Sequence, residues 1–289
     1  MQELQWFPGH MAKTRRLIED NLKMIDVVVE ILDSRIPYSG RNPYFNDIIK
    51  NKPRLVVMNK TDLSDERLTR EWTEWYKAQG VGVIPISCTT GSGVNKITDA
   101  ARALIQDKID RDAERGRKRT LKIMMVGIPN VGKSSLINRL AGKASAKTGD
   151  RPGVTTGKQW IRLRGDVELL DTPGILAPKF ENQEVAKRLA YTGAIKDEIV
   201  DTELLAYALC GYLGKSYPKE LCARYKLDNI EGLEGHEILE KIARKRGFVI
   251  SGGEADTERA ANVVLDEFRA AKIGRITLER PVDIEAAEA

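Results

Sequence analysis

Cysteine, histidine and long apolar runs are scarce in this chain of 289 residues. The three cysteines, Cys88, Cys210 and Cys222, are scattered and odd in number, which excludes a disulfide framework and favours a reducing compartment. Two histidines, His10 and His236, are too few for a multi-histidine metal site. No run of about 18 apolar residues occurs, so the sequence predicts no membrane span.

The first eleven residues also lack the apolar core of a secretory signal, and we therefore expect a cytoplasmic protein. What is present is typical of folded globular proteins: 42% hydrophobic and 31% charged residues, with a net charge of +5. At roughly 150 residues per domain, the length favours about two domains.

The net charge is unevenly distributed. Residues 1–176 carry 30 Lys and Arg against 21 Asp and Glu, whereas residues 177–289 carry 17 against 21, so their net charges are +9 and −4. A basic first part is compatible with a polyanionic partner, although many proteins that bind no nucleic acid share it.

Short β-branched runs alternate with helical patterns up to about residue 176. This alternation predicts an α/β domain whose sheet is mostly parallel and covered on both faces. The expected strands are 26–32, 54–58, 82–87, 121–126 and a hairpin of 160–163 with 167–170. The expected helices are 12–22, 65–78, 94–109 and 133–140.

After Pro178 the patterns are helical only, with apolar residues three and four positions apart. They predict helices over residues 184–193, 203–213, 236–246 and 257–271. We therefore expect one α/β domain over residues 1–178 and an all-helical domain over 179–289.

Residues 127–134, Gly-Ile-Pro-Asn-Val-Gly-Lys-Ser, match the phosphate-binding loop pattern G-x-x-x-x-G-K-S in full. They follow an apolar strand and open a helical pattern, which is the context that this motif requires. Backbone amides at the helix start bind phosphate, Lys133 neutralises the β- and γ-phosphates, and the Ser134 hydroxyl holds a magnesium ion. A chance glycine-rich turn is the alternative, and the order of strand, motif and helix argues against it.

Residues 59–62, Asn-Lys-Thr-Asp, end a predicted strand and select the base. The Asp62 carboxylate can accept hydrogen bonds from the ring N–H and the exocyclic amine of guanine. Adenine lacks donors at those positions and would leave a buried carboxylate unpaired, which is costly. Together with the phosphate-binding loop, this motif predicts a guanine nucleotide. Ser87 and Cys88, at the end of the next strand, can contact the guanine through main-chain groups.

Two further segments fit the phosphate side of such a site. In residues 171–174, Asp-Thr-Pro-Gly, the Asp171 carboxylate can hold magnesium through water and the Gly174 amide can meet the γ-phosphate. Thr155 lies in a polar glycine-containing loop of the kind that closes over metal and γ-phosphate. Thr156 is the competing candidate, and ordinary turn chemistry is the alternative explanation for both.

The predicted site thus comprises three sets of residues. Guanine nucleotide contacts are expected from Asn59, Lys60, Asp62, Ser87, Cys88, Asn130, Val131, Gly132, Lys133, Ser134, Ser135, Thr155 and Gly174. Magnesium contacts are expected from Ser134, Thr155 and, through water, Asp171. The catalytic candidate is His10.

The order of the motifs along the chain is unusual. Regulatory GTPases place the phosphate-binding loop first, whereas here the base-reading segments at 59–62 and 87–88 precede it. This order indicates a circularly permuted GTPase, which requires ends that can be joined and new termini in exposed loops. The permutation connects the loop after Gly174 directly to the helical part, so a nucleotide-dependent movement there could reorient that part.

The motifs together resemble the ribosome biogenesis GTPase A (YlqF/RbgA) family. The resemblance rests on residues 6–11, Trp-Phe-Pro-Gly-His-Met, residues 33–37, Asp-Ser-Arg-Ile-Pro, the guanine motif, the phosphate-binding loop and residues 152–155, Pro-Gly-Val-Thr. It implies a GTPase that acts late in assembly of the large (50S) ribosomal subunit and binds ribosomal RNA. It also implies that the helical tail is the part that binds this RNA. Apart from the resemblance, we expect a monomer without a membrane partner.

Composition does not support RNA binding by the tail, whose net charge is −4. Only a local cluster, Lys241, Arg244, Lys245 and Arg246, offers a basic helix face, and a solvated face is an equally good interpretation.

The sequence lacks one catalytic side chain that Ras-like GTPases use. Ras-like GTPases orient the attacking water with a glutamine after Asp-x-x-Gly, and that position is Ile175 here. We therefore expect slow hydrolysis by the isolated protein and stimulation by the ribosomal subunit. His10, on the Pro8–Gly9 segment, is the internal candidate for the missing function, and an RNA-contacting histidine is the alternative. The family resemblance, whose motif includes this histidine, strengthens the catalytic hypothesis.

Asn130 suggests potassium as an additional cofactor, since some GTPases with asparagine at this position use potassium beside the phosphates. Turn geometry alone also favours asparagine here. Two other functions remain open: a GTP-sensing module with negligible turnover, which Ile175 permits, and a GTPase of RNA modification, for which no second catalytic cluster is present.

Overall fold

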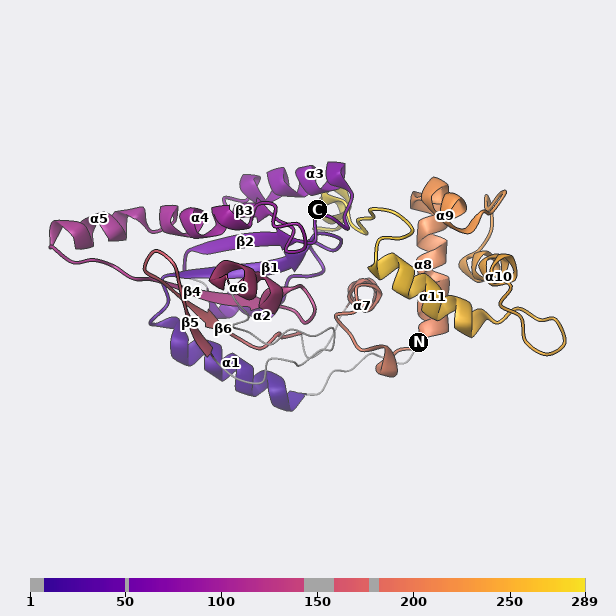
Figure 1. Ribbon diagram of the computed structural model, residues 1–289, viewed down its shortest axis with the longest axis horizontal. Helices are drawn as coiled ribbons and strands as arrows, with labels where there is room; N and C mark the ends of the chain where they lie inside the picture. Colours follow the sequence, from indigo (N-terminus) through magenta and orange to yellow (C-terminus); the bar gives the residue numbers. More distant parts are fainter. Residues whose placement is uncertain (1–7, 50–51, 143–158, 177–181, 289) are drawn as a thin grey trace. The chain divides into compact units, whose positions relative to one another are not determined.

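The structure is a computed structural model that describes residues 8–49, 52–142, 159–176 and 182–288 (Figure 1). The chain divides into two compact units, one formed by Met1–Glu181 with Thr277–Ala289 and the other by Asn182–Ile276. The expected helical domain over 179–289 is therefore wrong at its C-terminal end. The reason is that the last segment has its own buried contacts with the first unit.

The first unit is built on one six-stranded sheet. The strands are β1 (Val27–Asp33), β2 (Arg54–Asn59), β3 (Gly82–Pro85), β4 (Leu121–Gly127), β5 (Gln159–Leu163) and β6 (Val167–Asp171). Their order is β3-β2-β1-β4-β6-β5, and every neighbouring pair is parallel except the β5–β6 hairpin. The predicted mostly parallel α/β fold is confirmed, including the hairpin.

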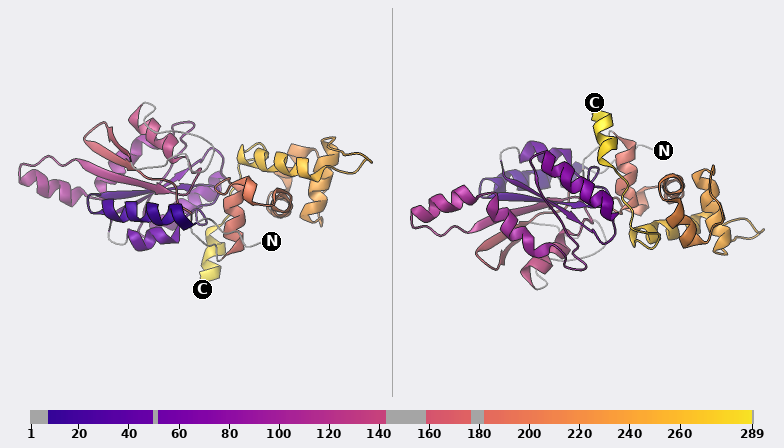
Figure 2. Two further views of the ribbon diagram at one scale, coloured as in Figure 1. Left: turned by 90° about the horizontal axis from the view of Figure 1, so that it is seen from below. Right: turned by 90° about the horizontal axis from the view of Figure 1, so that it is seen from above.

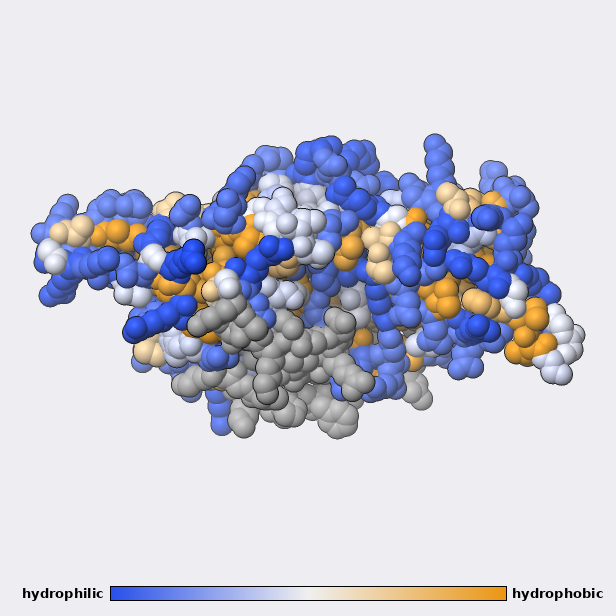
Figure 3. All heavy atoms as spheres, in the orientation of Figure 1, coloured by the Kyte–Doolittle hydropathy of each residue, from blue (hydrophilic) through white to orange (hydrophobic). Residues whose placement is uncertain are grey.

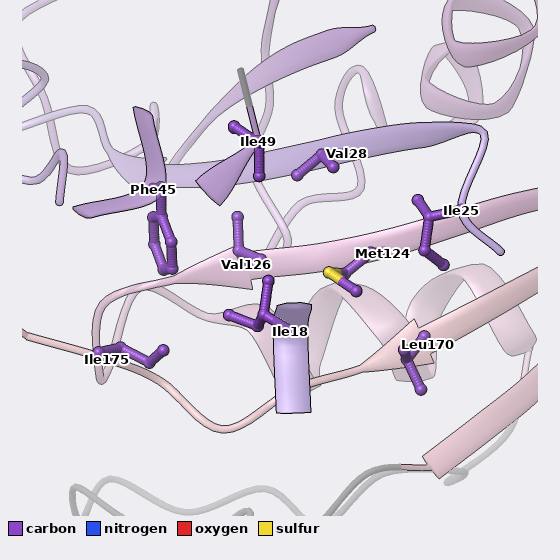
Figure 4. Close-up of a cluster of buried hydrophobic side chains, with 9 residues drawn as sticks. All are labelled: Ile18, Ile25, Val28, Phe45, Ile49, Met124, Val126, Leu170 and Ile175. Atoms are coloured by element: carbon purple, nitrogen blue, oxygen red, sulfur yellow. The ribbon is translucent and has the colours of Figure 1, made fainter. Parts of the chain in front are cut away.

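One face of the sheet is covered by α1 (Pro8–Leu22), α2 (Pro43–Ile48) and α3 (Glu66–Ala78). Val28 and Leu32 lie four residues apart on β1 and so point to the same side. Val28 shares a buried cluster with Ile18 of α1 and Phe45 of α2 (Figure 4), and Leu32 shares another with Trp72 of α3. Figure 2 shows α4 (Ile97–Ala103) and α6 (Lys133–Ala141) on the opposite face.

Two predicted helices differ in their bounds, and one helix of the first unit was not predicted. The expected helix over 94–109 is divided into a short 3-10 helix, Val94–Lys96, then α4 and α5 (Gln106–Glu114). Helix α5 has no buried residue, and the surface over it is largely hydrophilic in Figure 3. Helix α1 begins four residues earlier than expected and includes His10 in its first turn, while α2 was not predicted at all.

The second unit is helical, as predicted. Its helices are α7 (Gln183–Tyr191), α8 (Thr202–Ser216), α9 (Pro218–Tyr225), α10 (Gly235–Lys245) and α11 (Thr257–Arg269), with a 3-10 helix at Asp197–Ile199. Helix α8 contacts the other four helices of this unit. Glu267, the one charged residue on the buried side of α11, is paired with Arg224 and Arg246, which accounts for its position.

The last segment of the chain packs within the first unit. The Trp72 indole of α3 donates a hydrogen bond to the Glu279 carbonyl, with 3.1 Å between nitrogen and oxygen. Ile284 of α12 (Pro281–Glu288) joins the same apolar cluster as Trp72. Across the described helices, none has the length and apolar character needed to cross a bilayer.

Candidate GTP-binding site

The phosphate-binding loop joins the last residue of β4, Gly127, to the first residue of α6, Lys133. Gly132 has φ +90°, and a Cβ there would collide with the Asn59 side-chain amide, so glycine is required for two reasons. Asn130 has φ +60°, a conformation that asparagine adopts more readily than most residues. Turn geometry is therefore sufficient to explain Asn130, and Ser134 and Ser135 follow in the first turn of α6.

Lys133 connects this loop to the end of β6. Its buried ammonium lies 2.8 Å from Asp171 Oδ1 and also donates to the carbonyl of Thr172. Burial lowers the pKa of Lys133, and the Asp171 carboxylate partly offsets this effect. The structure thus brings together the two residues predicted to serve phosphate and magnesium.

The guanine motif is tied to the phosphate-binding loop by side chains from the end of β2. Asn59 Nδ2 donates to the carbonyl of Val131 at 2.7 Å, and Asn59 Oδ1 accepts from the Cys88 amide at 3.0 Å. Lys60 Nζ donates to the carbonyl of Asn130 at 2.6 Å. Motifs some 30 and 70 residues apart in sequence therefore form one site at the carboxyl ends of β2, β3 and β4.

Asp62 has the feature expected of a base-reading residue. Its Oδ1 atom is buried and has no hydrogen-bond partner among the residues that the structure describes, although buried acceptors are normally satisfied. An atom of this kind fits the two N–H donors of guanine. The neighbouring Cys88 thiol has its pKa raised to about 11 by burial, so it is neutral and contributes through its backbone.

One residue of this site, Arg139 in α6, was missed by the sequence analysis. Its Nε atom donates to the carbonyl of Cys88 and a terminal nitrogen to that of Thr89, both at 2.7 Å. Arg139 thereby holds the base-side loop after β3. No sequence motif marks it, because its contacts are with backbone atoms about 50 residues away.

The segment after β6 lies against the phosphate-binding loop. A Cβ at Gly174 would come within 2.9 Å of the Pro129 backbone nitrogen, which explains the glycine. Ile175 donates its backbone N–H to the carbonyl of Gly127 at 3.1 Å. Its side chain points away into the core, where it is buried with Ile18 and Phe45 (Figure 4).

Replacing Ile175 with glutamine is therefore expected not to restore a Ras-like catalytic residue. The new amide would be placed among apolar side chains and would cost about 2 kcal/mol of stability. Urea denaturation and basal GTP turnover measure the two effects. A variant that is as stable as the parent and hydrolyses GTP faster would contradict this placement.

Two predicted participants lie outside what the structure describes. Thr155 and its competitor Thr156 fall within residues 143–158, and of His10 only the helical backbone is described. The basic cluster on the helical unit is described and is largely paired with acidic residues. Arg244 binds Glu240, Lys245 lies 3.8 Å from Asp228, and Arg246 binds Glu267.

Comparisons with known proteins agree with this site. Residues 122–209 match the family model described as "50S ribosome-binding GTPase". The chain is 48% identical to ribosome biogenesis GTPase A of Bacillus cereus over 96% of this chain and 94% of that protein. It is also 48% identical to the Priestia megaterium protein of the same name, with 98% of each chain covered.

A solved structure is similar over nearly the whole chain. The crystal structure of GNP-bound YlqF from T. maritima matches with a TM-score of 0.63 and 28% identity, covering 93% of this chain and 98% of that one. Identity near one half across almost the entire length, together with the permuted order of the nucleotide motifs, leads to one conclusion. The chain belongs to the ribosome biogenesis GTPase A family.

Proposed function

We propose that this GTPase assembles the large ribosomal subunit, binds ribosomal RNA and uses its nucleotide state to change conformation. The observation that carries the proposal is the buried, unpartnered Oδ1 atom of Asp62 at the end of a strand joined to the phosphate-binding loop. It supports guanine as the base. The names of the relatives support ribosome assembly as the process.

In the proposed binding mode, guanine meets Asp62 and the loop that contains Ser87 and Cys88. The phosphates lie on the backbone of residues 130–135. Lys133 exchanges its Asp171 partner for the β- and γ-phosphates, because together they carry more negative charge than one carboxylate. Asp171 is thereby released for the metal side of the site.

Magnesium fits the donors on this side. The Ser134 hydroxyl and Asp171, through water, are hard oxygen ligands of the kind that magnesium prefers, and Thr155 is the proposed third residue. When bound, magnesium neutralises charge on the β- and γ-phosphates. Potassium remains a proposal that rests on Asn130 alone, and a comparison of turnover in potassium and sodium buffers tests it.

The connectivity of the chain suggests how a change of nucleotide would reach the helical unit. Residues 171–176, which line the phosphate side, lead along the chain into the helical unit at Asn182. A nucleotide-dependent shift of this segment would act on that unit directly. The large subunit as partner is supported by the description of the matched family model, and ribosome assembly is consistent with a monomer in the cytoplasm.

A second candidate is a GTP-sensing module with negligible turnover. The observation in its favour is that Ile175 is a core residue and supplies no group to the attacking water. In this case the protein would bind ribosomal particles in its GTP state and release them only by nucleotide exchange.

Sedimentation with purified ribosomal particles tests the proposal. We expect binding to large-subunit particles with a non-hydrolysable GTP analogue and weaker binding with GDP. Binding with the same affinity in both nucleotide states would reject the switch. Preference for small-subunit particles would reject the proposed partner.

A further inference from the structure

A buried ion pair lies at the carboxyl end of β1 and has no place in the site described so far. Asp33 and Arg35 each expose only 2% of their side chains. Asp33 Oδ1 accepts hydrogen bonds from the backbone N–H and the Nε of Arg35, and Asp33 Oδ2 accepts from a terminal Arg35 nitrogen at 2.7 Å. The guanidinium thus satisfies the carboxylate and fixes its orientation.

The same carboxylate also contacts the guanine motif. Lys60 Nζ lies 3.0 Å from Asp33 Oδ2 and donates to the carbonyl of Asn130 at 2.6 Å. Lys60 has φ +65°, so its backbone is in the left-handed region that few non-glycine residues occupy. The ammonium is held between β1 and the phosphate-binding loop, and the two cations keep the pKa of Asp33 well below its usual range despite burial.

Hydrogen bonds from Thr277 and Leu278, near the C-terminal end of the chain, fix the loop that carries this ion pair. The Thr277 hydroxyl contacts the carbonyl of Ser34 at 3.3 Å and accepts the amide of Asp65 at 3.1 Å. The amide of Leu278 donates to the carbonyl of Arg35 at 2.8 Å. The loops after β1 and β2 are therefore joined by residues more than 200 positions away.

We propose that Asp33 is a positioning residue for guanine nucleotide binding, which acts by holding Lys60 extended between the guanine motif and the phosphate-binding loop. A lysine side chain has many rotamers, and ordering it opposes binding. The Asp33 carboxylate orders Lys60 before the nucleotide arrives, and Arg35 keeps that carboxylate in place. This inference rests on the proposed role of the guanine motif.

Loss of the Asp33 contact is expected to lower the affinities for GTP and GDP equally. Lys60 contacts the backbone of the phosphate-binding loop on the base side, and the γ-phosphate is not part of this contact. Loss of the positioning should therefore weaken both nucleotides by the same factor and leave the ratio of their affinities unchanged.

A double-mutant cycle tests this directly. The first change is Asp33→Asn together with Arg35→Gln, which removes both charges of the buried pair, so that neither Asp33 nor Arg35 is left as a lone buried charge. The second change is Lys60→Met. Calorimetric affinities for GDP and a non-hydrolysable GTP analogue are measured for the parent, each change alone and both combined.

If Asp33 acts through Lys60, the first change weakens both nucleotides about tenfold in the parent and less than twofold once Lys60 is methionine. Equal losses in both backgrounds, or unchanged affinities in the parent background, would overturn the proposal. A parent that binds no guanine nucleotide would instead reject the proposed function. Should the double charge removal prevent folding, Asp33→Glu replaces it in the same cycle, because it keeps the charge and displaces the carboxylate.

A matched control separates positioning from stability. Asp26, directly before the first residue of the same strand, has a largely buried carboxylate paired with Arg119. Asp26→Asn is expected to lower the melting temperature and to leave both nucleotide affinities unchanged. A loss of affinity like that at Asp33 would mean that any buried charge lost from β1 has this effect, and it would also overturn the proposal.

Discussion

Replacing Asp62 with asparagine is expected to weaken GTP binding by about 2–3 kcal/mol, since a hydrogen-bonded charge is lost from a buried site. This corresponds to a loss of about 30- to 150-fold in affinity. The preference should shift toward xanthine nucleotides, because xanthine carries a carbonyl in place of the exocyclic amine. An asparagine amide can donate to that carbonyl, and a carboxylate cannot.

Asp65 provides the matched control for this substitution. It lies three residues further on, and its carboxylate caps α3 by accepting the amide of Leu68 at 3.0 Å. Asparagine is an equally good cap, so Asp65→Asn should change neither stability nor base preference. Titrations with GTP and XTP measure both variants. Unchanged affinities for both nucleotides in Asp62→Asn would remove Asp62 from the base site.

Replacing His10 with alanine is expected to lower ribosome-stimulated turnover about 100-fold, the lower part of the range for general acid–base groups. An imidazole can position the attacking water in the place of the side chain that Ile175 does not supply. GTP affinity should remain nearly unchanged, because the histidine would act in the transition state. Basal turnover should change much less, since the ribosomal particle is expected to order this segment.

His236 is the control for this experiment. It lies on α10, where its ring contacts that of Tyr207 edge to face, and His236→Ala should leave stimulated turnover intact. Single-turnover hydrolysis with saturating large-subunit particles gives the comparison. Normal stimulation of His10→Ala would exclude the catalytic role. Lost particle binding would identify His10 as an RNA contact.

The sheet could be predicted because its signals are local. The runs on β1, β2 and β4 are apolar and β-branched, and strands buried on both faces need that composition. Helix α2 has only six residues and no amphipathic repeat, so no periodicity marks it. The return of Thr277 and Glu279 to the first unit depends on single contacts across more than 200 residues, which no pattern in the sequence encodes.

The residues of the site also fall into those that a sequence motif reveals and those that only the tertiary structure reveals. Lys133, Asn59 and Asp62 were found because each belongs to a motif whose spacing follows from nucleotide chemistry. Arg139 and the Asp33–Lys60 contact were missed as site features because ion pairs and side chain–carbonyl contacts are set by the tertiary fold. Ile175 was recognised as unable to act on water, but its burial in the core became evident only from the packing of α1 and α2.

The most direct test of the account is GTP turnover by the purified protein, measured alone, with large-subunit particles and with small-subunit particles. The account predicts slow turnover alone, a large stimulation by the large subunit and none by the small subunit. Turnover that stays at the basal rate with large-subunit particles, although the protein binds them, would contradict it.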